Sequence, residues 1–317
     1  MPPTFSVVIP TYNQADFLRA ALKSVLAQTF QDFEIVVVNN YSTDDTLDVI
    51  RRFDDGRIRV INYHNEGLIG AARNIGIKAS NAPWVAFLDS DDSWNSRKLE
   101  EVAKAIEAYP GIGLVCHNQQ IVREGQLGKT ARFGPPSSFR GSVGDYLMQV
   151  SNCVCTSSTV VARAELEKVG NFSEDPSLVT VEDYDLWLKL SRVCRFHFIP
   201  DVLGIQNFHR NSASADPELH LRSTLAIIKE IRDEARRSDR PLPRTAVRRH
   251  YANAFFGAAR QYHRKGVFRE PFGLYIRTIR AYPLSAKAYA GMALLFIDIL
   301  MGRARRRRMM GSTASGG

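Results

Sequence analysis

Short apolar runs alternate with segments of helical periodicity through the first 118 residues of the chain. Runs of apolar and β-branched residues predict strands, and apolar residues at every third or fourth position predict helices. Strands are expected at residues 6–9, 34–38, 57–61, 84–88 and 113–117. Helices are expected between them at 15–27, 45–53, 68–79 and 96–109. This alternation predicts an α/β fold whose mostly parallel sheet is covered by helices on both faces.

The pattern changes after residue 118. Residues 119–150 are rich in Gly, Pro, Ser and Gln, which predicts a looser excursion. Two further strands, at 156–162 and 195–199, are expected on either side of a helix at 183–191. From about residue 216 the pattern is helical, with helices expected at 219–237, 245–265, 270–281 and 285–302 and a disordered tail at 311–317. The predicted division is an α/β domain at 1–215 and an α-helical C-terminal extension at 216–317.

Composition places the chain among ordinary globular proteins. Of its 317 residues, 44% are apolar and 24% are charged. No basic segment followed by an apolar stretch opens the chain, so a signal peptide is not expected. The four cysteines show no metal-ligand spacing, which favours free thiols in a reducing cytoplasm.

The net charge of +9 is unevenly distributed. From Pro241 onward, fifteen Lys and Arg residues face only Glu270 and Asp298, which gives +13. The first 240 residues therefore carry −4, from 27 basic and 31 acidic side chains. Because the basic excess lies outside the predicted α/β domain, the charge does not indicate nucleic acid as a partner.

The predicted strand at 84–88 leads directly into three carboxylates, Asp89, Asp91 and Asp92. Packing alone does not favour this arrangement, because crowded carboxylates repel each other and are costly to desolvate. A divalent cation, which prefers oxygen ligands, would offset their charge. Ligands of open parallel sheets bind beyond the carboxyl ends of the strands, so the cluster predicts the metal and nucleotide floor of an active site. The alternative is a cap for the helix near Ser96, for which one acid would suffice.

Six sequence motifs follow one another at ordinary spacing: Ser6–Asn13, Leu26–Phe30, Asn65–Gly67, Ala72–Gly76, Asp89–Asp92 and Glu182–Asp183. In this order they resemble family 2 glycosyltransferases, over roughly residues 4 to 214. The resemblance implies the GT-A fold, a Rossmann-like, mostly parallel sheet flanked by helices. It also implies transfer of a sugar from a nucleoside diphosphate donor with inversion, using Mg²⁺ or Mn²⁺.

The resemblance implies that Pro10, Thr11 and Tyr12 contact the nucleotide base. Asn39 and Asn40 stand where family members commonly have aspartates, one of which, matching Asn40, accepts the N3–H of uracil. Asparagine accepts through its carbonyl but brings no charge. A UDP-sugar is therefore the expected donor, with the base left open. The alternative for Tyr12 is a partly buried loop aromatic, and Asp44 or Ser42 could cap the next helix.

The remaining donor-site residues are also assigned by resemblance. Arg73 is expected beside the donor, holding the acidic cluster. Asp89 supports the cluster, Asp91 meets the ribose or the metal, and Asp92 meets the metal. His209 is the expected third metal ligand, although the family often has an arginine where this chain has Asn207. The alternatives are a surface arginine at 73 and a surface loop histidine at 209.

Inverting transfer needs a carboxylate that takes the proton of the acceptor hydroxyl as this hydroxyl attacks. The resemblance places this base at Asp183, with Glu182 beside it, where an amphipathic helix opens. A helix N-terminus is expected to lower the pKa of Asp183. The Gln-x-x-Arg-Trp motif of processive synthases is absent from 206–210, so one transfer per encounter is expected. The alternative for the pair is helix capping.

The run Tyr289–Met301 is apolar except for Asp298 and is followed by Arg303 and Arg305–Arg308. About 13 residues are too few to span a bilayer. The run therefore predicts a helix that lies on an anionic membrane surface, which suits a lipid-linked acceptor. The alternative is a packed helix with a solvated basic end.

The prediction is a metal-dependent, inverting glycosyltransferase of the hexosyltransferase type, acting on a glycan or lipid-linked glycan in bacterial surface polysaccharide or glycolipid biosynthesis. It is expected in the cytoplasm, peripherally on the inner face of the cell membrane. One rival is a nucleotidyltransferase acting on sugar phosphates, which would need a glycine- and basic-rich phosphate loop that residues 6–13 lack. The other is a non-catalytic, membrane-associated interaction protein, which would not need Asp183 opposite a metal cluster.

Overall fold

The computed structural model describes residues 1–209, 215–237 and 242–313, with side chains up to residue 301. The chain forms two compact units, Met1–Ser212 (unit 1) and Ala213–Gly317 (unit 2). In the part of the chain that is described, no helix combines the length and apolar character that crossing a membrane requires.

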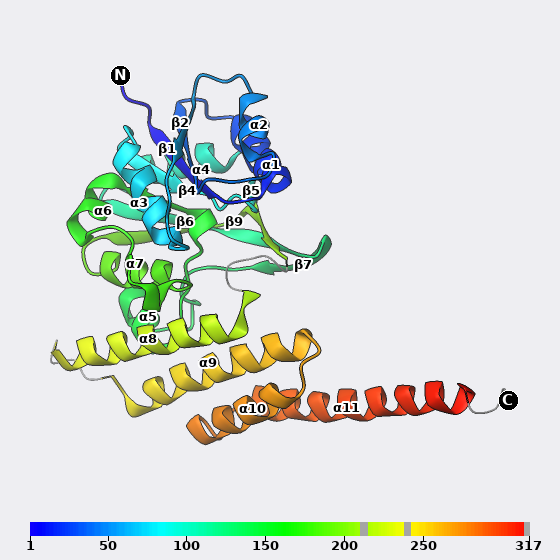
Figure 1. Ribbon diagram of the computed structural model, residues 1–317. Helices are drawn as coiled ribbons and strands as arrows, with labels where there is room; N and C mark the ends of the chain where they lie inside the picture. Colours follow the sequence, from blue (N-terminus) through cyan, green and yellow to red (C-terminus); the bar gives the residue numbers. More distant parts are fainter. Residues whose placement is uncertain (210–214, 238–241, 314–317) are drawn as a thin grey trace. The chain divides into compact units, whose positions relative to one another are not determined.

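Unit 1 is built on one sheet of nine strands (Figure 1). The strands are β1 (Phe5–Thr11), β2 (Phe33–Asn39), β3 (Ile58–Asn62), β4 (Trp84–Phe87), β5 (Ser93–Trp94), β6 (Ile112–Arg123), β7 (Gln126–Ala131), β8 (Thr159–Ala162) and β9 (Arg195–Phe208). Their order is β3-β2-β1-β4-β8-β6-β9-β5, with β7 paired to β6. Neighbours from β3 to β4 are parallel, as are β6 and β9, while β8 runs antiparallel between β4 and β6. The predicted mostly parallel sheet is confirmed.

The helices of unit 1 are α1 (Ala15–Leu26), α2 (Thr46–Arg51), α3 (Ile69–Ala79), α4 (Lys98–Ala108), α5 (Val143–Gln149), α6 (Arg163–Val169) and α7 (Glu182–Leu190), with short 3₁₀ turns η1 (Thr156–Ser158) and η2 (Pro176–Leu178). Every residue of β1 is buried, and so is nearly every residue of β2. Strands buried on both faces read as continuous apolar runs, which is why these two strands stood out in the sequence.

Residues 119–150 differ from the prediction of a loose excursion. Strand β6 runs on to Arg123, and a tight turn at Glu124 and Gly125, both with positive φ, leads into β7. A capping box between Ser142 and Asp145 then starts helix α5. The end of β6 is partly exposed and β7 is exposed and polar, so this hairpin lacks the apolar run that marks a buried strand.

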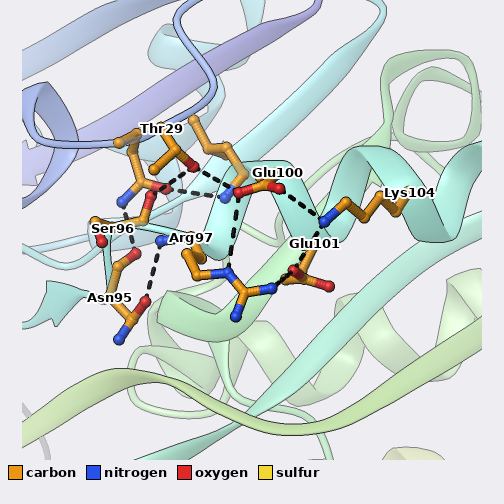
Figure 2. A network of polar contacts seen from close by, with 9 residues as sticks. Thr29, Asn95, Ser96, Arg97, Glu100, Glu101 and Lys104 are labelled. Atoms are coloured by element: carbon orange, nitrogen blue, oxygen red, sulfur yellow. Dashed lines mark hydrogen bonds and ion pairs between the residues drawn. The ribbon is translucent and has the colours of Figure 1, made fainter.

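A polar network fixes the segment that follows the acidic cluster (Figure 2). The amide of Thr29 donates to the carbonyl oxygen of Ser96 (2.8 Å), and its hydroxyl donates to Glu100 (2.8 Å). The side chain of Gln28 donates to the carbonyl of Asn95 (2.8 Å) and accepts from the amide of Leu99 (2.9 Å). The end of α1 therefore holds the start of α4 and, with it, the strand β5 beside the acidic cluster.

Unit 2 contains four helices in succession: α8 (Pro217–Arg237), α9 (Arg244–Arg264), α10 (Arg269–Ala281) and α11 (Ala286–Thr313). Its core is a cluster of side chains from α9, α10 and α11 that includes Phe255, Leu274, Tyr275 and Leu295. Helix α11 continues past the expected end at residue 302 and includes residues 311–313, which were predicted to be disordered. The side chains of Arg303 and Arg305–Arg308, and residues 314–317 altogether, lie outside the described residues.

In the part of the chain that the structure describes, the buried side chain of Lys98 lacks the hydrogen-bond partner that a buried amine normally has. Lys98 is fully buried at the start of α4, and its amine lies 3.3 Å from the centre of the Trp94 ring. Its Nζ has no hydrogen-bond partner among the described residues. Burial therefore lowers the pKa of Lys98 well below that of an exposed lysine.

We expect Lys98→Met to raise the free energy of unfolding by at least about 1 kcal/mol at pH 7, because it removes a buried amine that has no hydrogen-bond partner among the described residues. Between the lowered pKa of Lys98 and a pH of about 10, the folded protein binds fewer protons than the unfolded chain, so the gain shrinks as the pH rises through this range. Urea unfolding at several pH values measures it. Lys104→Met, at an exposed lysine of the same helix, is the control. A Lys98→Met variant that is less stable than the parent at pH 7 would contradict this account.

Candidate active site

The acidic cluster lies where β4 ends, and the turn η1 holds it in place through hydrogen bonds. The amide of Asp89 donates to the hydroxyl of Ser157 (3.0 Å). The indole N–H of Trp94 donates to the carbonyl oxygen of Ser157 (2.7 Å). Ser157 is fully buried, so this residue links the two ends of the acidic segment through the interior of the sheet.

Arg73 joins the acidic cluster to helix α7. Its side chain is buried, with one guanidinium nitrogen 2.7 Å from Asp89 and the other 2.6 Å from Glu182. Burial alone would lower the pKa of this arginine, but the carboxylates of Asp89 and Glu182 outweigh it and raise the pKa. Charge-assisted bonds of this length are the strong kind. Arg73 therefore fixes two carboxylates that lie 93 positions apart in the sequence.

Two glycines let α3 bring Arg73 into this position. A Cβ at Gly70 would lie 2.6 Å from the carbonyl oxygen of Ser173, and a Cβ at Gly76 would lie 2.3 Å from a methyl of Val8. Real side chains do not approach so closely, so only glycine allows α3 to pack against β1 on one side and the 173 segment on the other.

Asp91, in the segment after β4, and His209, directly after β9, form a second contact of the site. The imidazole Nε2 lies 2.9 Å from a carboxylate oxygen of Asp91. The ring of Phe17, from α1, stacks on the imidazole with the centroids 4.5 Å apart. Burial and the nearby charge of Asp89 raise the pKa of Asp91 to about 6. The two residues are predicted metal ligands, and the structure brings them into contact.

Asp92, also a predicted metal ligand, bonds inwards. A carboxylate oxygen of Asp92 accepts from the amide of Asn207 (2.8 Å), while the Asn207 side chain donates to the carbonyl of Asp91 (2.6 Å). Burial and the charges of Asp91 and Asp89 raise the pKa of Asp92 well above its usual value. Asn207, which lies in β9 two residues before His209, therefore contacts both Asp91 and Asp92.

The donor set fits a divalent cation at Asp91 and His209. Their carboxylate oxygen and imidazole nitrogen converge, and both are atoms that divalent cations accept as ligands. Asp92 does not converge with them, and among the side chains that the structure describes no group of three or more His, Cys, Asp or Glu residues is arranged to hold a metal ion. The remaining ligands would have to come from water or a bound phosphate.

Glu182 and Asp183 open helix α7, as predicted. A carboxylate oxygen of Asp183 accepts from Thr156 (3.2 Å), and the other accepts from the amide of Tyr184 (2.7 Å). The expected lowering of its pKa is wrong, because burial outweighs these hydrogen bonds and the pKa of Asp183 is raised. Burial likewise raises the pKa of Glu182 to about 7, against the effect of Arg73. Both carboxylates are therefore more basic than exposed ones.

The predicted base-contacting residues Pro10, Thr11 and Tyr12 lie at the end of β1. Thr11 is buried, and its hydroxyl has no hydrogen-bond partner among the described residues. Tyr12 is 56% exposed, so its ring is open to a ligand. The loop that follows is ordered, since Asn13 accepts from the amide of Thr43 (2.7 Å).

Asn39 and Asn40 use their carbonyl oxygens within the protein. Asn39 is buried, donates to Asn62 (2.8 Å) and accepts from the amide of Ser42 (3.1 Å), so it joins the ends of β2 and β3. The side-chain oxygen of Asn40 accepts from the amide of Asn65 (3.1 Å). Each of these oxygens accepts a hydrogen bond within the protein, and an amide oxygen has two lone pairs, so uracil recognition at Asn40 stays a prediction.

Sequence reasoning did not identify Ser157, Thr156 or Phe17, and it noted Asn207 only as a departure from the family pattern. Ser157 and Thr156 lie in a run of small polar residues that is nevertheless buried. A buried polar run before an apolar strand is the one signal that could have drawn attention to them. Phe17 resembles any other aromatic residue on an amphipathic helix, so nothing in the sequence sets it apart.

Comparison with known proteins agrees with this fold. The profile of Glycosyl transferase family 2 matches residues 6–168. A protein from Escherichia coli named UDP-Glc:α-D-GlcNAc-diphosphoundecaprenol β-1,3-glucosyltransferase WfaP is 31% identical over 71% of this chain and 86% of its own length. The chain belongs to glycosyl transferase family 2, as the motifs indicated.

Other relatives match over less of their own length. An uncharacterized glycosyltransferase from Rickettsia felis is 30% identical over 67% of this chain but only 35% of its own length. One from Nostoc, named alr2836, is 36% identical over 54% of each chain. The chain thus spans about a third to a half of the length of these two relatives.

Solved structures share the fold. The S. aureus protein TarS, residues 1–349, in complex with UDP-GlcNAc superimposes with a TM-score of 0.62 at 20% identity over 92% of both chains. The mannosyltransferase PcManGT from Pyrobaculum calidifontis, in complex with GDP-Man and Mn²⁺, gives 0.54 at 18% identity over 96% of this chain and 80% of its own. The predicted GT-A fold followed by a helical C-terminal region is confirmed.

We expect Arg73→Met to lower the free energy of unfolding by about 3–5 kcal/mol at pH 7, because it leaves Asp89 and Glu182 close together without a cation. The loss should be smaller at pH 5, because Glu182 without Arg73 holds a proton in the folded variant but not in the unfolded chain, so a lower pH favours the folded variant. Urea denaturation measures both values. The control Arg51→Met removes an exposed ion pair, with side chains 74% and 60% exposed, and should cost under about 1 kcal/mol. Equal effects of the two substitutions would show that Arg73 does not join the site.

Proposed function

We propose that the chain is an inverting glycosyltransferase that moves a sugar from a nucleoside-diphosphate-sugar to an acceptor hydroxyl. The observation that carries the proposal is the double ion pair of Arg73. It fixes the acidic cluster after β4 on one side and the start of α7 on the other. A donor bound over Asp89 and Asp91 would have Asp183, the neighbour of Glu182, facing its sugar.

Asp183 acts as the general base in this proposal. Each of its carboxylate oxygens accepts one hydrogen bond, from Thr156 or from Tyr184, which orients the group and leaves lone pairs for a proton. Its raised pKa makes it a stronger proton acceptor than an exposed aspartate. The acceptor hydroxyl gives its proton to Asp183 as its oxygen bonds to the anomeric carbon and the bond to the diphosphate breaks. Attack from the side opposite the leaving group inverts the anomeric configuration.

Asp91 and His209 would hold a divalent cation, Mg²⁺ or Mn²⁺, whose charge would offset that of the departing diphosphate. Phe17 keeps the imidazole oriented by stacking on it. Asn207 keeps Asp91 in place by bonding to its carbonyl oxygen. Asp92, which the motif also suggests as a ligand, accepts from the backbone amide of the same Asn207.

The relatives suggest a substrate class. WfaP and WfgD, each 31% identical to this chain, carry names that give UDP-Glc as donor and a diphosphoundecaprenol-linked sugar as acceptor. A 26% identical protein of Erwinia amylovora is named for amylovoran biosynthesis. We therefore propose a UDP-sugar as donor and a glycan or lipid-linked glycan as acceptor, in the synthesis of a bacterial surface polysaccharide or glycolipid. Nucleotide base selection would rest on Tyr12 and the backbone near Asn40.

Asp183→Asn should lower kcat by about 100-fold or more, because asparagine cannot take the proton, while nucleotide binding stays within about twofold. Turnover is measured as nucleotide release with the most active pair from a panel of nucleotide sugars and acceptors, and binding by calorimetry with the free nucleotide. Asp185→Asn, two residues along the same helix and paired with Lys189, is the matched control. Near-normal turnover of the Asp183 variant would remove this residue as the base.

Asp91→Asn should abolish most of the gain in nucleotide affinity that Mn²⁺ provides, a loss of about tenfold or more, since it removes the charged ligand of the cation. Calorimetric titration with the nucleotide, with and without Mn²⁺, separates this loss from metal-independent binding. Asp16→Asn, at an exposed aspartate of α1, serves as the control. If both variants retain the full effect of Mn²⁺, the cation is not held at Asp91.

A further inference from the structure

The outward side of helix α11 is apolar over its described length. Phe296, Ile297 and Leu300 are 49%, 50% and 63% exposed. Tyr289, Leu294 and Met301 are similarly exposed. Tyr289 lies seven positions before Phe296, Leu294 lies three before Ile297, and Met301 lies four after Ile297. That spacing places all six on one side of the helix. An exposed apolar side on a soluble helix normally marks an interaction site.

The core of unit 2 does not need this side, because the opposite side of α11 is already packed. Ala288 and Leu295 are fully buried, and Leu295 belongs to the core cluster with Tyr275. A Cβ at Gly291 would lie 2.6 Å from the ring of Tyr275, so α11 approaches α10 as closely as glycine allows. The helix is therefore apolar on two sides, of which the core uses one.

Helix α10 continues the exposed apolar surface. Phe272 is exposed and packs edge-on against Phe296, with the ring centroids 5.9 Å apart. Arg269 and Arg280 are exposed on the same side of α10, three residues before Phe272 and eight after it. Long arginine side chains at the margin of an apolar surface can reach towards polar groups while their stems stay on that surface. We call the surface of Phe272, Tyr289, Leu294, Phe296, Ile297, Leu300 and Met301 the α10–α11 face.

The charge of the segment that carries this face is mostly positive. Residues 241–301 contain ten Lys and Arg against two acids, Glu270 and Asp298. Asp298 is at the edge of the face and is bound to His263 of α9, with Nε2 and the carboxylate oxygen 2.9 Å apart. The segment that carries the face therefore has a strong basic excess. A second copy of the chain docked on this face would bring like charges together, which disfavours self-association through it.

We propose that the α10–α11 face docks unit 2 on an anionic lipid surface. The aromatic and aliphatic side chains enter the boundary between head groups and acyl chains, and the surrounding Arg and Lys side chains meet the lipid phosphates. Because the inner side of α11 stays packed on α10, the helix lies along the surface. The proposal does not depend on catalysis, but such docking would bring the enzyme to the layer that holds a lipid-linked acceptor.

Co-sedimentation of the full chain with vesicles tests the docking. We expect binding to phosphatidylglycerol vesicles, weakening as salt rises, and much weaker binding to phosphatidylcholine vesicles. Phe296→Ser/Ile297→Ser/Leu300→Ser should weaken binding by at least about tenfold, since binding scales with the buried apolar area. Leu127→Ser, at a 77% exposed leucine on β7 of unit 1, is the control and should bind like the parent. Arg269→Gln/Arg280→Gln should weaken binding and flatten its salt dependence.

A reporter that leaves the face apolar covers the case in which the triple variant misfolds. All three native tryptophans, Trp84, Trp94 and Trp187, lie in unit 1. Ile297→Trp should therefore give a blue-shifted emission component on addition of phosphatidylglycerol vesicles, and brominated lipid should quench it. Leu127→Trp should show neither change. No binding by the parent, equal binding by the triple variant, or a dimer in light scattering that the triple variant abolishes would each overturn the proposal, whatever the enzymatic activity.

Discussion

The buried guanidinium of Arg73 is the interaction on which the rest of the site depends. It lies between Asp89, at the end of a strand, and Glu182, at the start of a helix, and both bonds are short. A buried cation between two carboxylates is strongly coupled to them, because each group left alone would pay the full cost of desolvation. Gly70 and Gly76 are the structural condition for this bridge, since any side chain there would push α3 away. The proposed catalytic site and the stability of the fold therefore depend on the same side chain.

Around this bridge, the residues of the candidate site are held in place by contacts from several elements of unit 1. Ser157, in η1, accepts a hydrogen bond from the amide of Asp89. Asn207, in β9, donates its amide to Asp92. Thr156 and Phe17 orient Asp183 and His209 in turn. Four carboxylates have raised pKa values, Asp91, Asp92, Glu182 and Asp183, and burial is the main cause for each. A dense group of poorly compensated acids is what a cation and a diphosphate donor would complete.

The strands and helices could be predicted well from the sequence, because buried parallel strands read as apolar runs and the helices carry regular apolar spacing. The hairpin at 119–131 could not, since its strands are half exposed and polar. The acidic residues were found because three crowded carboxylates after a strand are not explained by packing, and this is visible in the sequence. Their supports, Ser157 and Asn207, are ordinary polar residues whose roles depend on strand pairing far along the chain. The raised pKa of Asp183 was missed for a related reason: burial arises from tertiary packing, whereas the helix terminus is visible locally.

The central claim is that Arg73 and Glu182 are energetically coupled across the site. A double-mutant cycle with Arg73→Met and Glu182→Gln, followed by urea unfolding at pH 7, measures this coupling directly. The account predicts a coupling free energy of about 2 kcal/mol or more, because removing both partners leaves less uncompensated charge than removing the arginine alone. Additive effects, with a coupling below about 0.5 kcal/mol, would contradict it.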